Sequence, residues 1–303
     1  MASQLTINEL FDPEFLSALQ NFTLRLSRIQ KGGRLAEQKS TARGQGLEFA
    51  DYKGYVPGDD LRAIDWNIYN RLGKIFVRVF EEQQDLPVYF LVDVSSSMFL
   101  ESTPRIHAAL RTTLALSAIA LSQHDSIGLF PFAEEMQIKV KSSSGKRNIM
   151  RTAQHLVELE EQQGGTSLAT SIAHLANVRL RQGLVVIISD FFDEEGLDKV
   201  IAAMKQLRHR ILLVQMTQPW DAEPEQNPEL YGDVRLQDCE SDAMAEVTIT
   251  PAIIHRYKEI YQQFNQQLED FAKSYSAGFT RIDASGDVLK QLTKLFESGG
   301  LQL

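Results

Sequence analysis

The stretch FLVDVSSSMFL, residues 90–100, places one carboxylate and three hydroxyls directly after an apolar run. In an extended chain alternate side chains share a side, so Asp93, Ser95 and Ser97 can converge. Carboxylate and hydroxyl oxygens are hard ligands, which suit Mg²⁺, Mn²⁺ or Ca²⁺ rather than Zn²⁺. Hydroxyls bind ions weakly alone, so further oxygens must come from other loops. A Ser-rich turn after a strand is also typical of a helix cap, and this alternative stays open for DVSSSM by itself.

Two other segments place oxygens at comparable points of the chain. Thr166 follows two glycines in QQGGTSLAT, at the expected start of a helix, and glycine lets the backbone approach a site closely. Asp190 ends the apolar run in LVVIISDFFD, just as Asp93 ends its own run. The candidate metal-binding set therefore consists of oxygens from three loops: Asp93, Ser95, Ser97, Thr166 and Asp190.

From residue 86 onward, apolar strands alternate with helices. We expect strands at 87–94, 126–132, 184–189, 211–216 and 279–282, a short edge strand at 136–141, and helices at 104–121, 147–159, 167–180, 197–207, 251–274 and 288–296. A less regular acidic insertion follows residue 216, with short strands at 234–237 and 247–249. This alternation predicts an α/β fold, a doubly wound and mostly parallel sheet with helices on both faces. Such sheets bind ligands at the carboxyl ends of their strands, where Asp93 and Asp190 stand.

The first 85 residues differ from the rest of the chain. Residues 13–29 have apolar side chains at helical spacing, residues 31–46 indicate a loop, and residues 47–85 are irregular with a strand-like run at 74–80. We therefore divide the chain into residues 1–85, an N-terminal helix and a cap segment, and residues 86–303, the α/β domain. Dense charge among aromatics around Trp66 predicts a cap packed on that domain, and a docking surface for a partner is the alternative.

Composition argues against several classes of protein. The net charge of −9 is unsuited to a nucleic-acid partner, which needs a basic face. The single cysteine, Cys239, cannot form an internal disulfide. The N-terminus does not resemble a signal peptide, and no apolar run approaches the ~18 residues of a membrane span. We expect a cytoplasmic protein without membrane insertion.

Motifs for catalysis are missing from the sequence. It contains no P-loop motif, no Gly-x-Ser-x-Gly elbow around the serines, and no histidine pair suited to catalysis. We therefore expect a binding protein rather than an enzyme.

The order DVSSS, GGT and ISD resembles the metal-ion-dependent adhesion site of von Willebrand factor type A domains, and the resemblance covers residues 86–303. It implies that Ser95, Ser97 and Thr166 bind a divalent cation directly, with Mg²⁺ expected and Mn²⁺ or Ca²⁺ as the other hard ions. It implies that Asp93 and Asp190 act mainly through bound waters. The open coordination position would then be filled by an Asp or Glu of a partner protein.

The segment at 42–82, ARGQGLEFADYKGYVPGDDLRAIDWNIYNRLGKIFVRVFEE, resembles the signature of an uncharacterised bacterial family that carries a type A domain. Members are commonly encoded beside MoxR-type AAA+ ATPases. Lys53 stands where that signature has Arg, and Tyr69-Asn70 replaces a smaller residue. The resemblance implies an adaptor that works with a MoxR-type ATPase in the assembly or maturation of a larger complex.

Two other functional classes stay open. A metal-dependent phosphoesterase could use the same oxygens, although Ser95 stands where aspartyl-phosphate chemistry normally places a second Asp. A structural scaffold with a vacant site is the third class.

Overall fold

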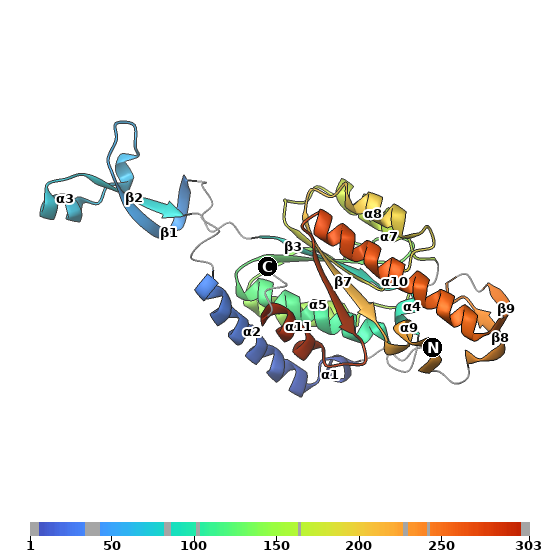
Figure 1. Cartoon of the computed structure of the whole chain (residues 1–303). Coiled ribbons are helices and arrows are strands. Elements are labelled where there is room, and N and C mark those ends of the chain that lie inside the picture. The colour runs from blue at the N-terminus through green and yellow to red at the C-terminus, as the bar shows by residue number, and fades with distance from the viewer. Residues whose placement is uncertain are drawn as a thin grey trace. The chain divides into compact units, whose positions relative to one another are not determined.

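The computed structural model describes residues 6–33, 43–81, 86–100, 104–162, 165–226, 230–240 and 243–297. The described residues form two compact units (Figure 1). The larger unit combines residues up to 29 with those from 86 onward, and the smaller unit lies between residues 30 and 85.

A six-stranded sheet forms the centre of the larger unit, in the order β10-β7-β6-β3-β4-β5. The strands are β3 (Val88–Asp93), β4 (Ser126–Phe132), β5 (Val140–Ser144), β6 (Leu184–Ser189), β7 (Arg210–Thr217) and β10 (Gly278–Asp283). Neighbouring strands are parallel except for β4 and β5, which pair antiparallel at one edge. Every residue of β3 and β6 is buried, as expected for strands covered on both faces. The predicted α/β, doubly wound and mostly parallel architecture is confirmed.

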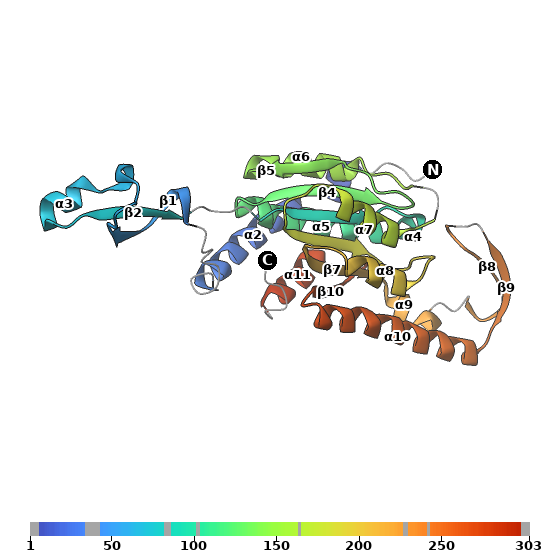
Figure 2. The ribbon, with the colours of Figure 1, turned by 90° about the horizontal axis from the view of Figure 1, so that it is seen from above.

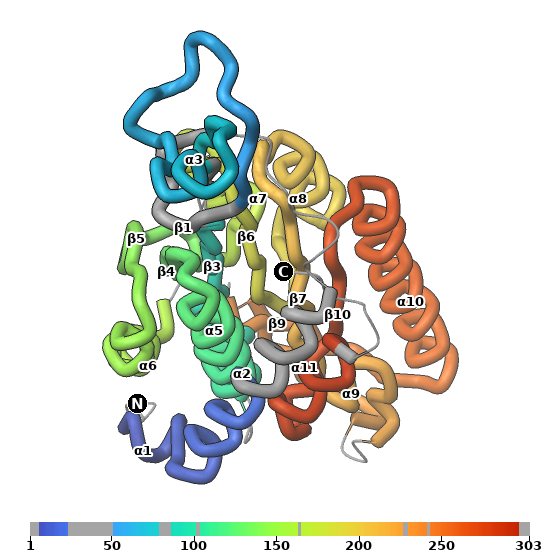
Figure 3. Tube along the Cα trace, turned by 90° about the vertical axis from the view of Figure 1, so that its left-hand side faces the viewer, coloured from blue at the N-terminus to red at the C-terminus, as the bar shows by residue number. Residues whose placement is uncertain are grey.

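Helices cover both faces of this sheet (Figure 3). They are α4 (Ser96–Phe99), α5 (Arg105–Ser122), α6 (Ile149–Val157), α7 (Leu168–Asn177), α8 (Leu197–Met204), α9 (Pro219–Ala222), α10 (Pro251–Ser274) and α11 (Val288–Glu297). Phe90 faces a core shared with α5, α6 and α11, whereas Leu91 faces a second core shared with α7, α8 and α10. Because successive side chains of β3 point to opposite faces of the sheet, this strand contributes to both hydrophobic cores.

The N-terminal helices α1 (Ile7–Leu10) and α2 (Pro13–Gly33) belong to the first of these cores. Their buried side chains Leu10, Phe11, Phe15, Leu19 and Phe22 share the core of α5 and α11. The rings of Phe22 and Phe296 lie 6.0 Å apart, and Arg111 on α5 donates a hydrogen bond to the carbonyl of Leu10. The predicted division at residue 85 placed the N-terminal helix with the cap segment and apart from the α/β domain, whereas in the structure the apolar face of these helices is covered by that domain.

The smaller unit is built on an antiparallel pair, β1 (Arg43–Gly54) and β2 (Phe76–Glu81). A 3₁₀ turn (Leu61–Ala63) and α3 (Trp66–Leu72) connect them. The Asp65 carboxylate caps α3 by accepting hydrogen bonds from the backbone of Asn67 and Ile68. Strand β2 was predicted, but β1 was not. Its first residues fall in the segment predicted as a loop, because their glycines and charges hide any alternation.

The acidic insertion forms a hairpin of its own. Strands β8 (Gly232–Gln237) and β9 (Met244–Ile249) pair antiparallel and are not joined to the six-stranded sheet (Figure 2). Both were predicted, with shorter bounds. The predicted edge strand at 136–141 is confirmed as a partner of β4, because Met136 bridges Phe132 and the backbone N atoms of Gln137 and Lys139 donate to carbonyls of β4. The regular strand β5 itself starts later, at Val140. Among the described helices, none combines the length and apolarity that crossing a bilayer requires.

Candidate metal centre

Two aspartates lie at the carboxyl edge of the sheet. Asp93 is the last residue of β3, and Asp190 directly follows β6. These strands are parallel neighbours, so their ends meet at the same edge. The chain leaves β3 toward β4 on one side and later fills β6 and β7 on the other, so the two carboxylates stand where the strand order reverses. This is the position at which open α/β sheets bind ligands.

A series of hydrogen bonds joins four of the five candidate residues. The Oδ1 of Asp93 accepts from the backbone N of Ser95 at 3.0 Å. The hydroxyls of Ser95 and Ser97 lie 3.1 Å apart. The Ser97 hydroxyl then donates to Oδ2 of Asp190 at 3.0 Å. The two strand ends are thus linked through the turn that starts α4.

Ser189 holds the Asp93 carboxylate and the turn that contains Asp190, and it was not singled out in the sequence. Its hydroxyl donates to Oδ2 of Asp93 at 2.5 Å and accepts from the backbone N of Phe191 at 2.8 Å. Phe191 has a φ of +65°, a left-handed backbone conformation that residues other than glycine rarely adopt. The turn continues with the backbone N of Phe192, which donates to Oδ1 of Asp190 at 3.1 Å. This turn fixes the direction of the Asp190 carboxylate.

The electrostatic balance at the sheet edge is negative. Asp93 and Asp190 are 0% and 1% exposed. Burial raises the pKa of Asp93 above its ordinary value, and the charge of Glu240 adds to that shift. Burial also raises the pKa of Asp190, and the charge of Asp93 raises it further. Arg105 opposes this, but its guanidinium also pairs with Asp221 at 2.5 Å. A cation between the two aspartates would relieve this repulsion.

Thr166 lies on the loop before α7 and is 3% exposed. The same loop runs beside the end of β3, where the backbone N of Gln162 donates to the carbonyl of Val94 at 3.1 Å. The backbone N of Thr166 donates to Oε2 of Glu240 at 3.0 Å, and its hydroxyl donates to Oε1 at 2.5 Å. The polar groups of Thr166 are therefore turned to Glu240, while its loop contacts the end of β3 through Gln162. Neither the sequence motifs nor the spacing pointed to Glu240.

The glycine pair was expected to let the backbone approach the site, and at Gly165 the close neighbour is instead the side chain of Glu194. A Cβ there would lie 2.6 Å from Oε1 of Glu194. Its neighbour Gly164 lies outside the described residues.

The composition of the set fits a hard divalent cation. Two carboxylates and three hydroxyls offer only oxygen, the ligand type of Mg²⁺, Mn²⁺ and Ca²⁺. Among the described residues, no three or more His, Cys, Asp or Glu side chains gather in a way that could hold an ion. The candidate set depends instead on hydroxyl groups, which the alternating spacing of Ser95 and Ser97 brings together.

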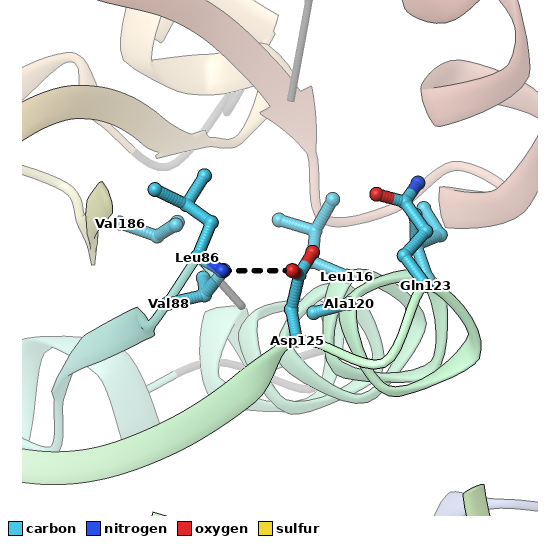
Figure 4. Close-up of a pocket in the computed structure, with 8 residues that line it drawn as sticks. Leu86, Val88, Leu116, Ala120, Gln123, Asp125 and Val186 are labelled. Carbon is cyan, nitrogen blue, oxygen red and sulfur yellow. Dashed lines mark hydrogen bonds between the residues drawn. The ribbon is translucent and has the colours of Figure 1, made fainter. Parts of the chain in front are cut away.

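A small recess lies at the amino ends of the strands, opposite the two aspartates (Figure 4). Its lining is mainly apolar: Leu86, Val88, Leu116, Ile119, Ala120, Gln123, Asp125 and Val186. The Asp125 carboxylate accepts from the backbone N of Leu86 at 2.9 Å, at the start of β3 and β4. Because the strands are parallel, this recess is at the far end from Asp93 and Asp190.

The fold and the site define an α/β protein with an oxygen-rich centre at the switch point of a mostly parallel sheet. Residues 51–267 match the model of the family described as Protein of unknown function DUF58, and the chain belongs to this family. The expected membership of an uncharacterised family is thereby confirmed.

Relatives and solved structures are similar over much of the chain. The uncharacterized protein Rv1480 of Mycobacterium tuberculosis is 26% identical over 246 residues, which cover 80% of this chain and 76% of that protein. The crystal structure of BatB from Bacteroides thetaiotaomicron has 13% sequence identity and a TM-score of 0.43, covering 70% of this chain and 98% of that chain. An aerotolerance-related membrane protein from Bacteroides fragilis has the same identity and TM-score, covering 70% and 99%. Neither structural similarity bears on function.

Proposed function

We propose that this chain is a protein-binding module that captures a carboxylate of its partner through a divalent cation. The observation that carries the proposal is the series of hydrogen bonds that links Asp93, Ser95, Ser97 and Asp190 between the ends of β3 and β6. The ion would lie among the five candidate residues Asp93, Ser95, Ser97, Thr166 and Asp190. The resemblance of this set to the adhesion site of von Willebrand factor type A domains supports the same role.

Each side chain has a distinct part in this proposal. The hydroxyls of Ser95, Ser97 and Thr166 would bind Mg²⁺ directly. Asp93 and Asp190 would hold its waters and orient the hydroxyls, since both already bond to the serine turn. With few charged groups in direct contact, the bound ion would keep a strong attraction for an additional Asp or Glu. That group would come from the partner.

The proposed partner is a MoxR-type AAA+ ATPase, with the chain acting as a non-enzymatic adaptor in the assembly or maturation of a complex. This part rests on the resemblance of residues 42–82 to the family signature. The smaller unit exposes Leu61, Trp66 and Leu72 by 62%, 59% and 65%. Large exposed apolar side chains are typical of a contact surface, which supports a second point of attachment.

The metal part of the proposal is tested by calorimetric titration of Mg²⁺ and Mn²⁺. The variant Ser95→Ala/Ser97→Ala should bind either ion at least ~10-fold more weakly than the wild type, because two oxygen ligands are lost. The matched control is Ser142→Ala/Ser144→Ala, two exposed serines with the same spacing around β5. Equal affinities of wild type and site variant would contradict the metal site.

The partner part is tested by pull-down of a purified MoxR-type ATPase from the same genome. Recovery should require Mg²⁺ and be lost with EDTA or in the Ser95→Ala/Ser97→Ala variant. Recovery that is indifferent to the chelator would leave the ion without its proposed role.

A further inference from the structure

Glu240 holds Thr166 with both carboxylate oxygens. One oxygen accepts from the Thr166 backbone N at 3.0 Å and the other from its hydroxyl at 2.5 Å, across 74 residues of sequence. Glu240 is half-buried, and its charge contributes to the raised pKa of Asp93. A carboxylate bound to one of the five candidate residues is therefore already supplied by the chain itself.

The β8–β9 hairpin presents this carboxylate. Glu240 lies in the connection between the strands, where its backbone N donates to Oδ1 of Asp238 at 2.8 Å. The backbone N of Asp238 in turn donates to the carbonyl of Ala243 at 2.8 Å. These bonds tie Glu240 and Ala243 to Asp238, while most side chains of both strands are exposed. A two-stranded hairpin outside the main sheet is marginally stable by itself, so its position depends on contacts such as that of Glu240.

We infer that Glu240 is an internal ligand of the metal centre, which takes the place of the partner's carboxylate until the β8–β9 hairpin moves aside. This inference rests on the proposed function, because it assigns the occupant of the position that the partner would take. Glu240 and the partner's Asp or Glu would offer the ion the same group, a carboxylate. The carboxylate of Glu240 is already directed at Thr166, one of the proposed ion ligands. The acidic insertion, which the proposed function did not explain, gains a role as a competitor for that position.

An internal competitor sets a threshold for partner binding. A group tethered to the same chain has an effective concentration in the millimolar range or above. A free carboxylate must exceed that concentration, or bring further contacts with it, before it reaches the ion. The partner is therefore expected to contact the hairpin or the nearby surface as well as the ion.

The test uses the full chain, Mn²⁺ as the ion and sodium acetate as the carboxylate probe. Bound Mn²⁺ speeds the relaxation of water protons, and acetate slows this again when it replaces a water on the ion. The variant Glu240→Gln keeps the shape of the side chain but removes its charge. It should show a higher relaxation enhancement for each bound Mn²⁺ and should respond to roughly 10-fold less acetate than the wild type.

The matched control is Glu246→Gln, the same substitution on the same hairpin. Glu246 is exposed on β9 and pairs with Arg235 at 2.9 Å, away from Thr166. This variant should behave as the wild type does. If Glu240→Gln and the wild type bind Mn²⁺ with the same enhancement and the same acetate response, the inference is overturned and the proposed function stands. If the wild type binds no Mn²⁺, the proposed function falls, and the inference falls with it.

Discussion

The hydroxyl of Ser189 joins the end of β3 to the turn that follows β6. It donates to Asp93 and accepts from the backbone N of Phe191, so the end of β6 holds the end of β3 in place. The residue is completely buried, and both contacts are short. A side chain in this position orients the Asp93 carboxylate without taking part in the proposed ion contacts itself.

We predict that Ser189→Ala weakens both folding and ion binding. Removing the hydroxyl leaves the buried N–H of Phe191 without its partner, which costs about 1–3 kcal/mol of unfolding free energy. Loss of the donor to Asp93 should lower Mn²⁺ affinity by ~10–100-fold. Urea unfolding and calorimetric titration measure the two effects.

The control for this variant is Ser122→Ala, which removes a hydroxyl that bonds only to the helix carbonyl of Ile119. It should leave Mn²⁺ affinity unchanged. A Ser189→Ala protein that is less stable but binds Mn²⁺ normally would make Ser189 a structural residue only.

The sequence predicted the candidate residues that mark the ends of elements, and missed those that depend on distant pairing. Asp93 and Asp190 each follow an apolar run, so their place on one edge of a parallel sheet could be predicted. Ser189 reads as the last residue of a buried strand, and nothing in its neighbours indicates a bond to β3. Glu240 pairs with a residue 74 positions earlier, and its hairpin lies outside the sheet whose topology guided the prediction.

At the scale of elements, the strands with the most apolar sequences were the easiest to predict. Strands β3 and β6 are continuous runs without turn residues, and the structure confirms both within a residue or two. Strand β1 is rich in glycine and charge, so its pairing with β2 decides its conformation rather than its own sequence. The bounds of β5 were predicted less well, because most of its residues are exposed and its sequence shows no buried face.

A glycine controls how closely β3 and β6 approach each other. A Cβ on Gly183, just before β6, would collide with the backbone carbonyl of Pro87, just before β3. That carbonyl accepts from the backbone N of Leu184 at 2.9 Å, so it cannot move away without breaking the pairing of the strands. Only a residue without a side chain allows this first contact of the two strands that carry the aspartates.

We predict that Gly183→Ala destabilises the larger unit by about 1–3 kcal/mol or more, because the strands must separate locally. The measurement is the free energy of unfolding in urea, followed through a probe in the larger unit. Gly54→Ala is the control, since a Cβ on Gly54 meets nothing within 4 Å. A Gly183→Ala protein as stable as the wild type would show that the strand ends can adjust without cost.

At the scale of the whole molecule, the N-terminal helices pack against elements that come much later in the chain. Residues up to 29 share a core with elements that follow residue 86, while the residues between form a separate compact unit. The helical spacing of residues 13–29 could be predicted, but the surface that receives their apolar face could not. The smaller unit is in this sense an insertion between α2 and β3.

We predict that a fragment starting at residue 86 is much less stable than the intact chain. It loses the burial of Phe15, Leu19 and Phe22, each worth roughly 1.5–3 kcal/mol, against a typical total of about 5–15 kcal/mol. Thermal unfolding and binding of a hydrophobic dye measure the effect. A peptide of residues 1–33 added in trans should restore stability, and the same peptide with Phe15→Asp and Phe22→Asp should not. A fragment that melts at the temperature of the intact chain would contradict this arrangement.

The separation in sequence between the oxygens of the proposed centre has a thermodynamic consequence. Ser97 and Asp190 are bonded to each other although they are 93 positions apart in the sequence. An ion held at this point would be released when the sheet unfolds, so ion binding and global unfolding are linked equilibria. An ion at 100 times its dissociation constant would add about 2.7 kcal/mol to the free energy of unfolding. The denaturation midpoint would thus serve as a gauge of cation occupancy, readable in the absence of any partner.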